Sequence, residues 1–417
     1  MGKKISKFRN PRVFTEEEIK LIEESFEINR SEIATMSTEV LSVKWHDYML
    51  NTTIDIWLQY LFPGTSKNLD WSRFTYLHKG QGSHFLEEKA QAIVRVLINI
   101  PKEEPLERSV ETEKVKTYFR DVIASYLRSL GSYENADFFK WLKIDATTFS
   151  YNLSDIINSL TSELKTDEVV AKDVEDWLRT KPIISDILNG LLCIAYGIVD
   201  VTSVPCVLPK PLSYFSTILD ISHVIFLCAH LTKTCTKNWK LRFHNQGHGS
   251  NYTLLCKTIL GVGPNLLIIK DHGNHVFGCF ASESWKQSTQ FYGDNRCFLF
   301  QLSPVLRLFE PSGTNNNFMY HNSSHHTYPN GFGMGGQIGF FGLWVDGDFG
   351  HGACSDFCST FTNFVRPSVS TQFTFTHIEV WAVADDSEDD DKNFYLQSRL
   401  SITDSDPFAR ALIEITR

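Results

Sequence analysis

Residues 331–348 read GFGMGGQIGFFGLWVDGD, and this stretch decides the fold of the second half of the chain. Glycines here punctuate aromatic and aliphatic residues at a period close to two, which is the period of a β-strand. Similar apolar or alternating runs occupy 266–280, 297–302 and 373–383. Many short strands with aromatic inward faces predict two packed antiparallel sheets.

The same glycines satisfy the letters G-x-G-x-x-G, at Gly331, Gly333 and Gly336. A dinucleotide site needs this motif to follow a strand and to open a helix, whose amides meet the pyrophosphate. Here Pro329 and Asn330 precede the motif, and an aromatic strand follows it. We therefore interpret the glycines as positions where sheet backbones turn or approach closely, with a nucleotide site as the alternative.

One set of residues in this half has the types that bind metals. Cys354 and Cys358 flank Asp356 and lie close in sequence to His351. Zinc sites use two compact ligand pairs that converge, and a second clear pair is missing here. We expect no metal site and no other cofactor.

Other residues have the types that perform hydrolysis. Asp346, Asp348 and Glu379 are candidates for paired acids, and Ser282 or Cys279 for a nucleophile. None of them stands in a motif with a defined mechanism, such as a nucleophile elbow. We expect no catalytic residue and no enzyme activity, and a cryptic hydrolase is the alternative.

The composition of the 417 residues limits the classes of function. A hydrophobic fraction of 42% and a charged fraction of 21% are typical of globular chains. The net charge of −9 argues against nucleic acid as a partner, because a phosphate-binding face needs clustered Lys and Arg. The nine cysteines are odd in number and irregularly spaced, and no apolar segment follows Met1. These features predict reduced thiols in a cytoplasmic protein without a secretory signal.

The first residues, MGKKISKFRN, fit a lipid-attachment signal. Gly2 with Ser6 downstream matches the pattern for N-myristoylation after removal of Met1. A single myristoyl chain binds membranes only marginally, so stable attachment needs a second signal. Basic residues next to the lipid would supply it on an anionic membrane surface, and the membrane-binding candidates are Lys3, Lys4, Lys7, Arg9 and Arg12.

The first half of the chain is predicted to be helical. Thr15 and Glu18 form a capping box for a helix over 16–28. A helix over 53–62 stops at Pro63 and Gly64, a loop follows, and a later helix is predicted over 85–100; this helix–loop–helix layout resembles a degenerate EF-hand pair. A calcium loop needs several oxygen ligands at alternating positions, and we expect no calcium binding because Asp70 is the loop's one carboxylate before Trp71. Further helices are predicted at 112–130, 153–164, 166–178 and after Pro182.

The carboxyl end combines an acidic run with an amphipathic segment. Residues 385–391 read DDSEDDD and are typical of a solvated linker. Asp406 and Pro407 then mark the first turn of a helix. Its apolar residues at helical spacing would either dock on the chain's own domain or bind a partner groove, and they are Phe408, Leu412 and Ile415.

In order, spacing and residue type, the strand motifs from about Pro209 to Asp385 resemble the TLDc domain. This family contains oxidation-resistance proteins and regulators that bind the vacuolar proton-pumping ATPase. The whole layout is similar to the lysosomal, target-of-rapamycin-associated branch of the family, with the strongest matches at 294–300, 329–337 and 404–415. The resemblance implies an α+β fold, in which a TLDc two-sheet antiparallel β-sandwich with flanking helices follows an all-helical region.

The resemblance also implies a function. It predicts a non-enzymatic regulator in the cytoplasm and on the cytosolic face of the lysosomal membrane. There the chain would contact the peripheral sector of the vacuolar ATPase and components of target-of-rapamycin signalling. An oxidation-resistance factor is the alternative. The expected parts are a basic, myristoylated tail at 1–13, a helical EF-hand-like region at 14–200, a TLDc domain at 209–385, and an acidic linker with a C-terminal helix at 386–417.

Overall fold

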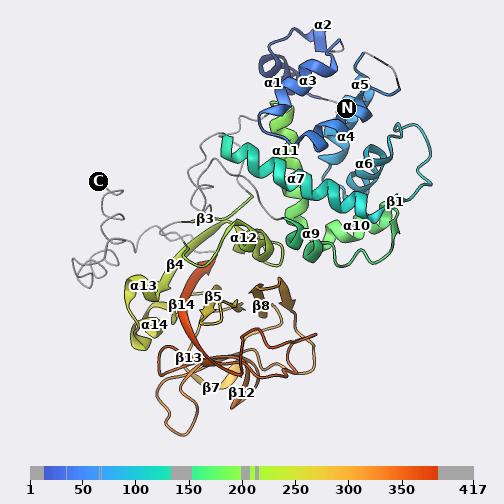
Figure 1. Ribbon diagram of the computed structural model, residues 1–417. Helices are drawn as coiled ribbons and strands as arrows, with labels where there is room; N and C mark the ends of the chain where they lie inside the picture. Colours follow the sequence, from blue (N-terminus) through green and yellow to red (C-terminus); the bar gives the residue numbers. More distant parts are fainter. Residues whose placement is uncertain are drawn as a thin grey trace, which may run out of the picture. The chain divides into compact units, whose positions relative to one another are not determined.

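The computed structural model describes residues 14–33, 35–64, 66, 68–132, 153–198, 207–211 and 216–383. The chain divides into two compact units (Figure 1). The helical unit comprises Met1–Leu208 and Val224–His230, and the β-rich unit comprises Pro209–His223 and Leu231–Arg417. A helical region is thus followed by a region rich in antiparallel sheet, and the predicted α+β class is confirmed. Within the described ranges, no helix is long and apolar enough to cross a membrane.

Ten helices and one small antiparallel ribbon are described in the helical unit before residue 200. The helices are α1 (Glu16–Phe26), α2 (Arg30–Ile33), α3 (Thr38–His46), α4 (Asn51–Leu61), α5 (Trp71–Gln81), α6 (Leu86–Ile98), α7 (Thr112–Ser132), α9 (Ser154–Leu160), α10 (Ala171–Thr180) and α11 (Pro182–Ala195); the ribbon pairs β1 (Val110–Glu111) with β2 (Glu168–Val169).

The helix boundaries follow from local sequence signals. In the predicted capping box, Glu18 N donates to Thr15 Oγ1 at 3.2 Å, and Thr15 N donates to the Glu18 carboxylate at 2.7 Å. Asp70 accepts a hydrogen bond from Arg73 N at 3.1 Å, so this carboxylate caps the start of α5. Pro182 occupies the first turn of α11, as its fixed φ allows.

The predicted start of the helix at 166 is wrong. The sequence predicts a helix over 166–178, but residues Glu168–Val169 form β2 and the helix α10 begins at Ala171. Val169 is paired with Val110 across the ribbon and is buried. The β-branched side chain gains more from this packing than from an additional helical turn.

The core of the helical unit is built on α7. Its apolar stripe, predicted at 112–130, is fully buried at Val115, Phe119 and Ile123. The hydroxyl of Tyr118 lies in the same core, where it accepts from Trp57 Nε1 at 3.1 Å and donates to Gln81 Oε1 at 2.8 Å. These bonds satisfy polar groups that would be costly to bury unpaired.

The β-rich part of the chain contains twelve described strands and a few short helices. The strands are β3 (Lys210–Pro211), β4 (Asn238–His244), β5 (Asn265–Asp271), β6 (Val276–Ala281), β7 (Ser288–Tyr292), β8 (Phe298–Ser303), β9 (Arg307–Phe309), β10 (Met319–Asn322), β11 (Gly331–Gln337), β12 (Phe340–Asp346), β13 (His351–Ala353) and β14 (Gln372–Val383); the helices are α12 (Ile221–Cys228), η2 (Lys233–Thr236), α13 (Asn245–His248) and α14 (Tyr252–Ile259).

These strands form two sheets that share β14. One sheet runs β4–β14–β5–β6–β8–β9, with β3 parallel to β4, and the other runs β14–β13–β12–β11–β10–β7, so that hydrogen bonds connect all twelve strands in one continuous series. Their inner faces meet in one core, where the Phe277 ring lies 5.1 Å from Phe373 and Trp285 lies 5.1 Å from Phe332. The predicted pair of packed antiparallel sheets is therefore confirmed.

The glycines of β11 have the predicted role of close approach. A Cβ at Gly331 would lie 2.3 Å from the Val345 carbonyl oxygen, and one at Gly333 would lie 2.5 Å from the Phe341 ring. β11 is paired on one side with β10 and on the other with β12, and no helix follows it. This geometry contradicts the nucleotide-site alternative, because no helix amides face the glycines.

Candidate functional site

The residues predicted to bind membrane, lipid and partner lie outside the part of the chain that the structure describes. They therefore stay predictions: Gly2, Lys3, Lys4, Lys7, Arg9 and Arg12 at the start, and Phe408, Leu412 and Ile415 at the end.

The candidate acids are placed as structural groups. Glu379 is buried in the part of β14 that pairs with β4 and β5, whereas Asp346 ends β12 in the other sheet. Asp346 accepts from Trp344 Nε1 at 3.2 Å and from Asp348 N at 2.8 Å, so it holds the turn after β12. The two carboxylates are therefore not brought together as an acid–base pair.

Glu379 is enclosed by four hydrogen bonds. Its Oε1 accepts from Thr217 N at 2.6 Å and from Thr217 Oγ1 at 2.8 Å. Its Oε2 accepts from Ser216 Oγ at 2.7 Å and from Trp381 Nε1 at 2.9 Å. Both oxygens are thus used to fix the segment before α12 to β14.

The candidate nucleophiles are also buried. Ser282 Oγ lies 3.2 Å from Cys297 Sγ, and burial raises the pKa of the Cys279 thiol far above its usual range. The sequence does not mark a further pair, Cys256 and His321, which meet at 3.7 Å from positions 65 residues apart. Burial raises the pKa of Cys256 and lowers that of His321 to about 4, so at neutral pH both groups are uncharged. Burial therefore favours the thiol of Cys256 over the thiolate that nucleophilic catalysis uses.

Cys354 and Cys358, for which the sequence predicts no zinc binding, lie in the following surroundings. Both thiols are buried, and burial raises the pKa of Cys354 to about 12. Asp356 is exposed and paired with Arg366, and His351 is exposed on β13. Within the described ranges, no group of three or more His, Cys, Asp or Glu residues is arranged to hold a metal ion.

Several large apolar side chains of the β-rich unit are exposed, and two of them lie at the end of one hairpin. The hairpin of β11 and β12 turns at Ile338 and Gly339, where Gln337 is paired with Phe340 and Gly339 has a φ of +87°. Ile338 is 41% exposed and Phe340 is 65% exposed, whereas Phe341 points inward and stacks on Trp344 at 4.6 Å. Two aromatic residues in succession on a strand must point to opposite faces, so Phe340 faces solvent.

A third exposed side chain lies on the loop that packs beside this hairpin. Ser355 N donates to the Phe341 carbonyl oxygen at 3.0 Å, and a Cβ at Gly342 would lie 2.9 Å from Cys358 Sγ. These contacts fix the loop that carries Phe357, which is 76% exposed. We call Ile338, Phe340 and Phe357 the apolar tip.

The apolar tip has the composition of a protein-binding surface. Aromatic residues are enriched in the buried cores of interfaces, and large apolar side chains that gather at one place on a surface mark sites of interaction. The neighbouring ion pair of Asp356 and Arg366 gives this surface a charged border. The tip is therefore the candidate functional site among the described residues.

Comparison with known proteins gives the same division of the chain. Residues 212–384 match the family model of the TLDc domain. The chain is 32% identical to the human MTOR-associated protein MEAK7 over 380 residues, which cover 85% of this chain and 79% of that protein. It is 39% identical to the mouse MTOR-associated protein MEAK7 over 250 residues, 58% of this chain and 54% of that protein. Oxidation resistance protein 1 of Xenopus tropicalis is 36% identical over 169 residues, 40% of this chain and 18% of that protein.

Proposed function

The chain belongs to the TLDc-domain family, and from this premise we propose that it is a non-enzymatic regulator of target-of-rapamycin signalling. It acts in the cytoplasm and on the cytosolic face of the lysosomal membrane, where it binds the peripheral sector of the vacuolar ATPase. The observation that carries this proposal is the similarity over 380 residues to a protein named for its association with MTOR. That similarity extends over the helical region as well as the TLDc domain.

The surroundings of the candidate catalytic groups support a non-enzymatic role. Glu379 is enclosed by four donors, and the Cys256–His321 pair is uncharged at neutral pH. The donors around Glu379 fix it to the segment before α12, and burial favours the Cys256 thiol over a reactive thiolate.

Two surfaces are available for contact with the pump in this proposal. One is the apolar tip, whose aromatic side chains are of the type that contributes most to binding energy. The other is the predicted C-terminal helix with Phe408, Leu412 and Ile415, which is suited to a hydrophobic groove.

A tagged pull-down from cell membranes tests this proposal. We expect the full chain to recover subunits of the peripheral ATPase sector and components of target-of-rapamycin signalling, identified by mass spectrometry. Serine at Phe408, Leu412 and Ile415 together should weaken the recovery, because it removes the apolar face of the helix without changing its charge. Recovery of signalling components without any pump subunit would contradict pump binding.

Attachment to the membrane gives a separate prediction for Gly2→Ala. This change removes the only amine that the myristoyl transferase modifies and keeps the basic cluster, so the protein should move from the membrane fraction to the cytosol. Fractionation by centrifugation measures the shift. Replacing Lys3, Lys4 and Lys7 by Gln should cause a partial loss that depends on salt. An unchanged membrane fraction for Gly2→Ala would rule out the lipid anchor.

The alternative of an oxidation-resistance factor has narrower support. It rests on the similarity to Oxidation resistance protein 1, which is confined to 169 residues and to 18% of that protein. A tagged chain that protects cells from oxidant without recovering the pump would favour it.

A further inference from the structure

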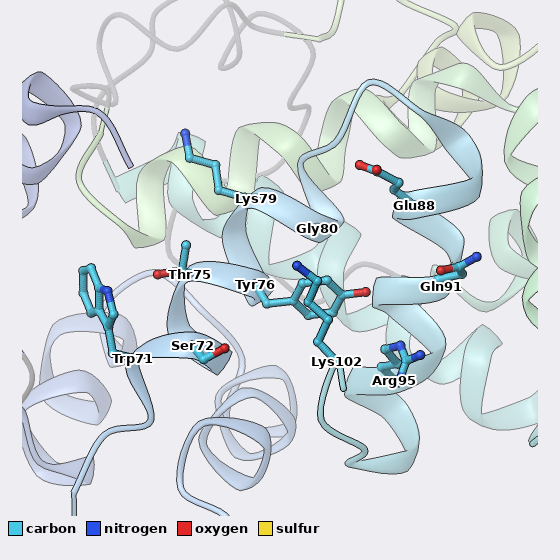
Figure 2. A pocket seen from close by; sticks show the side chains of 10 residues that line it. All are labelled: Trp71, Ser72, Thr75, Tyr76, Lys79, Gly80, Glu88, Gln91, Arg95 and Lys102. Carbon is cyan, nitrogen blue, oxygen red and sulfur yellow. The ribbon is translucent and has the colours of Figure 1, made fainter. Parts of the chain in front are cut away.

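A pocket with a volume of about 420 Å³ lies in the helical unit, between α5, α6 and the turn that follows α6 (Figure 2). This volume is within the range of small-molecule sites, roughly 300–1,000 Å³. The two helices are held together at Gly80, where a Cβ would lie only 2.8 Å from the Cβ of Ala92. The close packing at Gly80 makes this wall of the pocket rigid.

The pocket contains two cations that have no anionic partner in the described part of the chain. Arg95 is only 7% exposed, and its Nη1 donates to the Pro101 carbonyl oxygen at 2.7 Å. Among the described residues, the Arg95 guanidinium makes no further hydrogen bond and no ion pair. The Lys102 ammonium lies 5.6 Å from the centre of the Tyr76 ring, and it too is unpaired with any described carboxylate.

The other cation that lines the pocket, Lys79, is already paired inside the protein. Lys79 binds the Glu18 carboxylate at 2.5 Å, and Glu88 accepts a hydrogen bond from Ser83 Oγ at 3.1 Å. Arg95 and Lys102 are therefore the positive charges that a ligand would meet. The bond from Arg95 to the Pro101 carbonyl also fixes the turn that carries Lys102, so the two cations are held on one side of the pocket before any ligand binds.

Aromatic and neutral polar groups complete the walls. One face of the Trp71 indole stacks on Phe74 at 5.6 Å, and 36% of Trp71 remains exposed. In Figure 2 the Lys102 side chain overlies the Tyr76 ring, with Trp71 on one side of this pair and Arg95 and Gln91 on the other. A ligand here would meet the rings of Trp71 and Tyr76 together with two positive charges, one of which lies over the Tyr76 ring.

We propose that this pocket binds the phosphate group of a small phosphorylated molecule. Arg95 offers its remaining N–H groups in a planar fork that matches phosphate oxygens, and Lys102 adds a second charge. A phosphate monoester carries nearly two negative charges at neutral pH and so balances both cations, whereas a single carboxylate balances one. The volume exceeds that of phosphate alone, so an organic part lies against Tyr76 and Trp71.

Phosphate chemistry of this kind occurs on soluble metabolites and on lipid headgroups. The test therefore uses the full chain with three probes: inorganic phosphate, inositol 1-phosphate, and phosphatidylcholine vesicles with or without phosphatidylinositol 4-phosphate. Binding of the soluble probes is measured by ³¹P NMR line broadening and calorimetry, and vesicle binding by co-sedimentation. We expect saturable binding of both soluble probes, with inositol 1-phosphate binding more tightly because its ring contacts the aromatic side of the pocket.

Three variants assign the binding to this pocket. Lys102→Gln and Arg95→Gln should each weaken binding by about tenfold or more, the loss expected for one charge-assisted hydrogen bond. Arg95→Lys should be intermediate, because it keeps the charge and loses the fork. Lys20→Gln is the matched control: it changes net charge equally, but Lys20 lies on α1 and is 75% exposed beside Glu24.

Two controls distinguish a loss of ligand contacts from unfolding and from a general change in surface charge. Arg95→Gln also loses the bond to Pro101, so circular dichroism must show that this variant is folded. Lys102→Gln loses no hydrogen bond, and it serves as the test if Arg95→Gln is unfolded. Vesicle binding that falls in Lys102→Gln but not in Lys20→Gln identifies a lipid headgroup, and loss confined to the soluble probes identifies a metabolite. No saturable binding to any probe, or equal losses in Lys102→Gln and Lys20→Gln, would overturn the proposal.

Discussion

Replacing Trp381 with alanine is expected to lower the free energy of unfolding of the β-rich unit by about 3–5 kcal/mol. Trp381 is fully buried on β14, the strand that both sheets share, so the cavity would lie where the unit is held together. Its Nε1 also donates to the buried Glu379 at 2.9 Å, and loss of that donor leaves a polar oxygen less well satisfied. The free energy is measured by urea unfolding followed by circular dichroism and fluorescence.

Two variants serve as controls for Trp381→Ala. Trp71→Ala removes a partly exposed indole from the helical unit, so the unfolding midpoint of the β-rich unit should stay close to that of the wild type. Glu379→Gln keeps the shape of the side chain but places an amide among four donors, which should cost about 1–3 kcal/mol. A wild-type midpoint for both Trp381→Ala and Glu379→Gln would contradict a structural role for this contact.

The sheets and most helices could be predicted because their signals are local. The period-two runs mark strands, and Thr15 with Glu18 marks a helix start within four residues of sequence. The sharing of β14 by two sheets could not be predicted in this way. Its first residues pair with β13, and its later residues pair with β4 and β5, about a hundred residues away in sequence. Register over such separations depends on packing that no local pattern encodes.

The roles of the charged and reactive residues were less predictable for a related reason. The sequence presents Glu379 as a candidate acid, because the groups that enclose it, Ser216 and Thr217, are more than 160 residues away. The contact between Cys256 and His321 likewise joins positions far apart in sequence, 65 residues from each other. Whether such a group is reactive depends on its neighbours in space and on its burial, not on its residue type.

The sequence contains no distinctive motif for the apolar tip or for the pocket. The adjacent pair Phe340–Phe341 gives one signal, since one of two neighbouring strand residues must face outward. Sequence alone does not say which of the two is exposed, or that Phe357 lies on the loop packed beside them. Arg95 and Lys102 are similarly ordinary cations in sequence, and their lack of a carboxylate partner among the described residues is visible only when the counter-charges of α1 and α6 are placed.

Serine at both Phe340 and Phe357 is expected to weaken recovery of the vacuolar ATPase by at least about tenfold, because buried aromatic side chains at an interface typically contribute over 1 kcal/mol each. The fold should be unaffected, since both side chains are largely exposed and neither belongs to the core between the sheets. A pull-down at matched protein concentration measures the recovery, and urea unfolding verifies the stability.

The control for this variant is Val305→Ser, which replaces another apolar residue of the same unit that is 50% exposed and lies between β8 and β9, outside the hairpin and the loop that carry the tip. If the tip is the contact surface, Val305→Ser should recover the pump normally while the double variant does not. Because the Phe341 carbonyl binds Ser355 N through the backbone, the double variant keeps the contact that fixes the loop to the hairpin. A folded double variant that still recovers the pump at the wild-type level would therefore exclude the apolar tip as the contact surface. The predicted C-terminal helix would then be the remaining candidate for the contact.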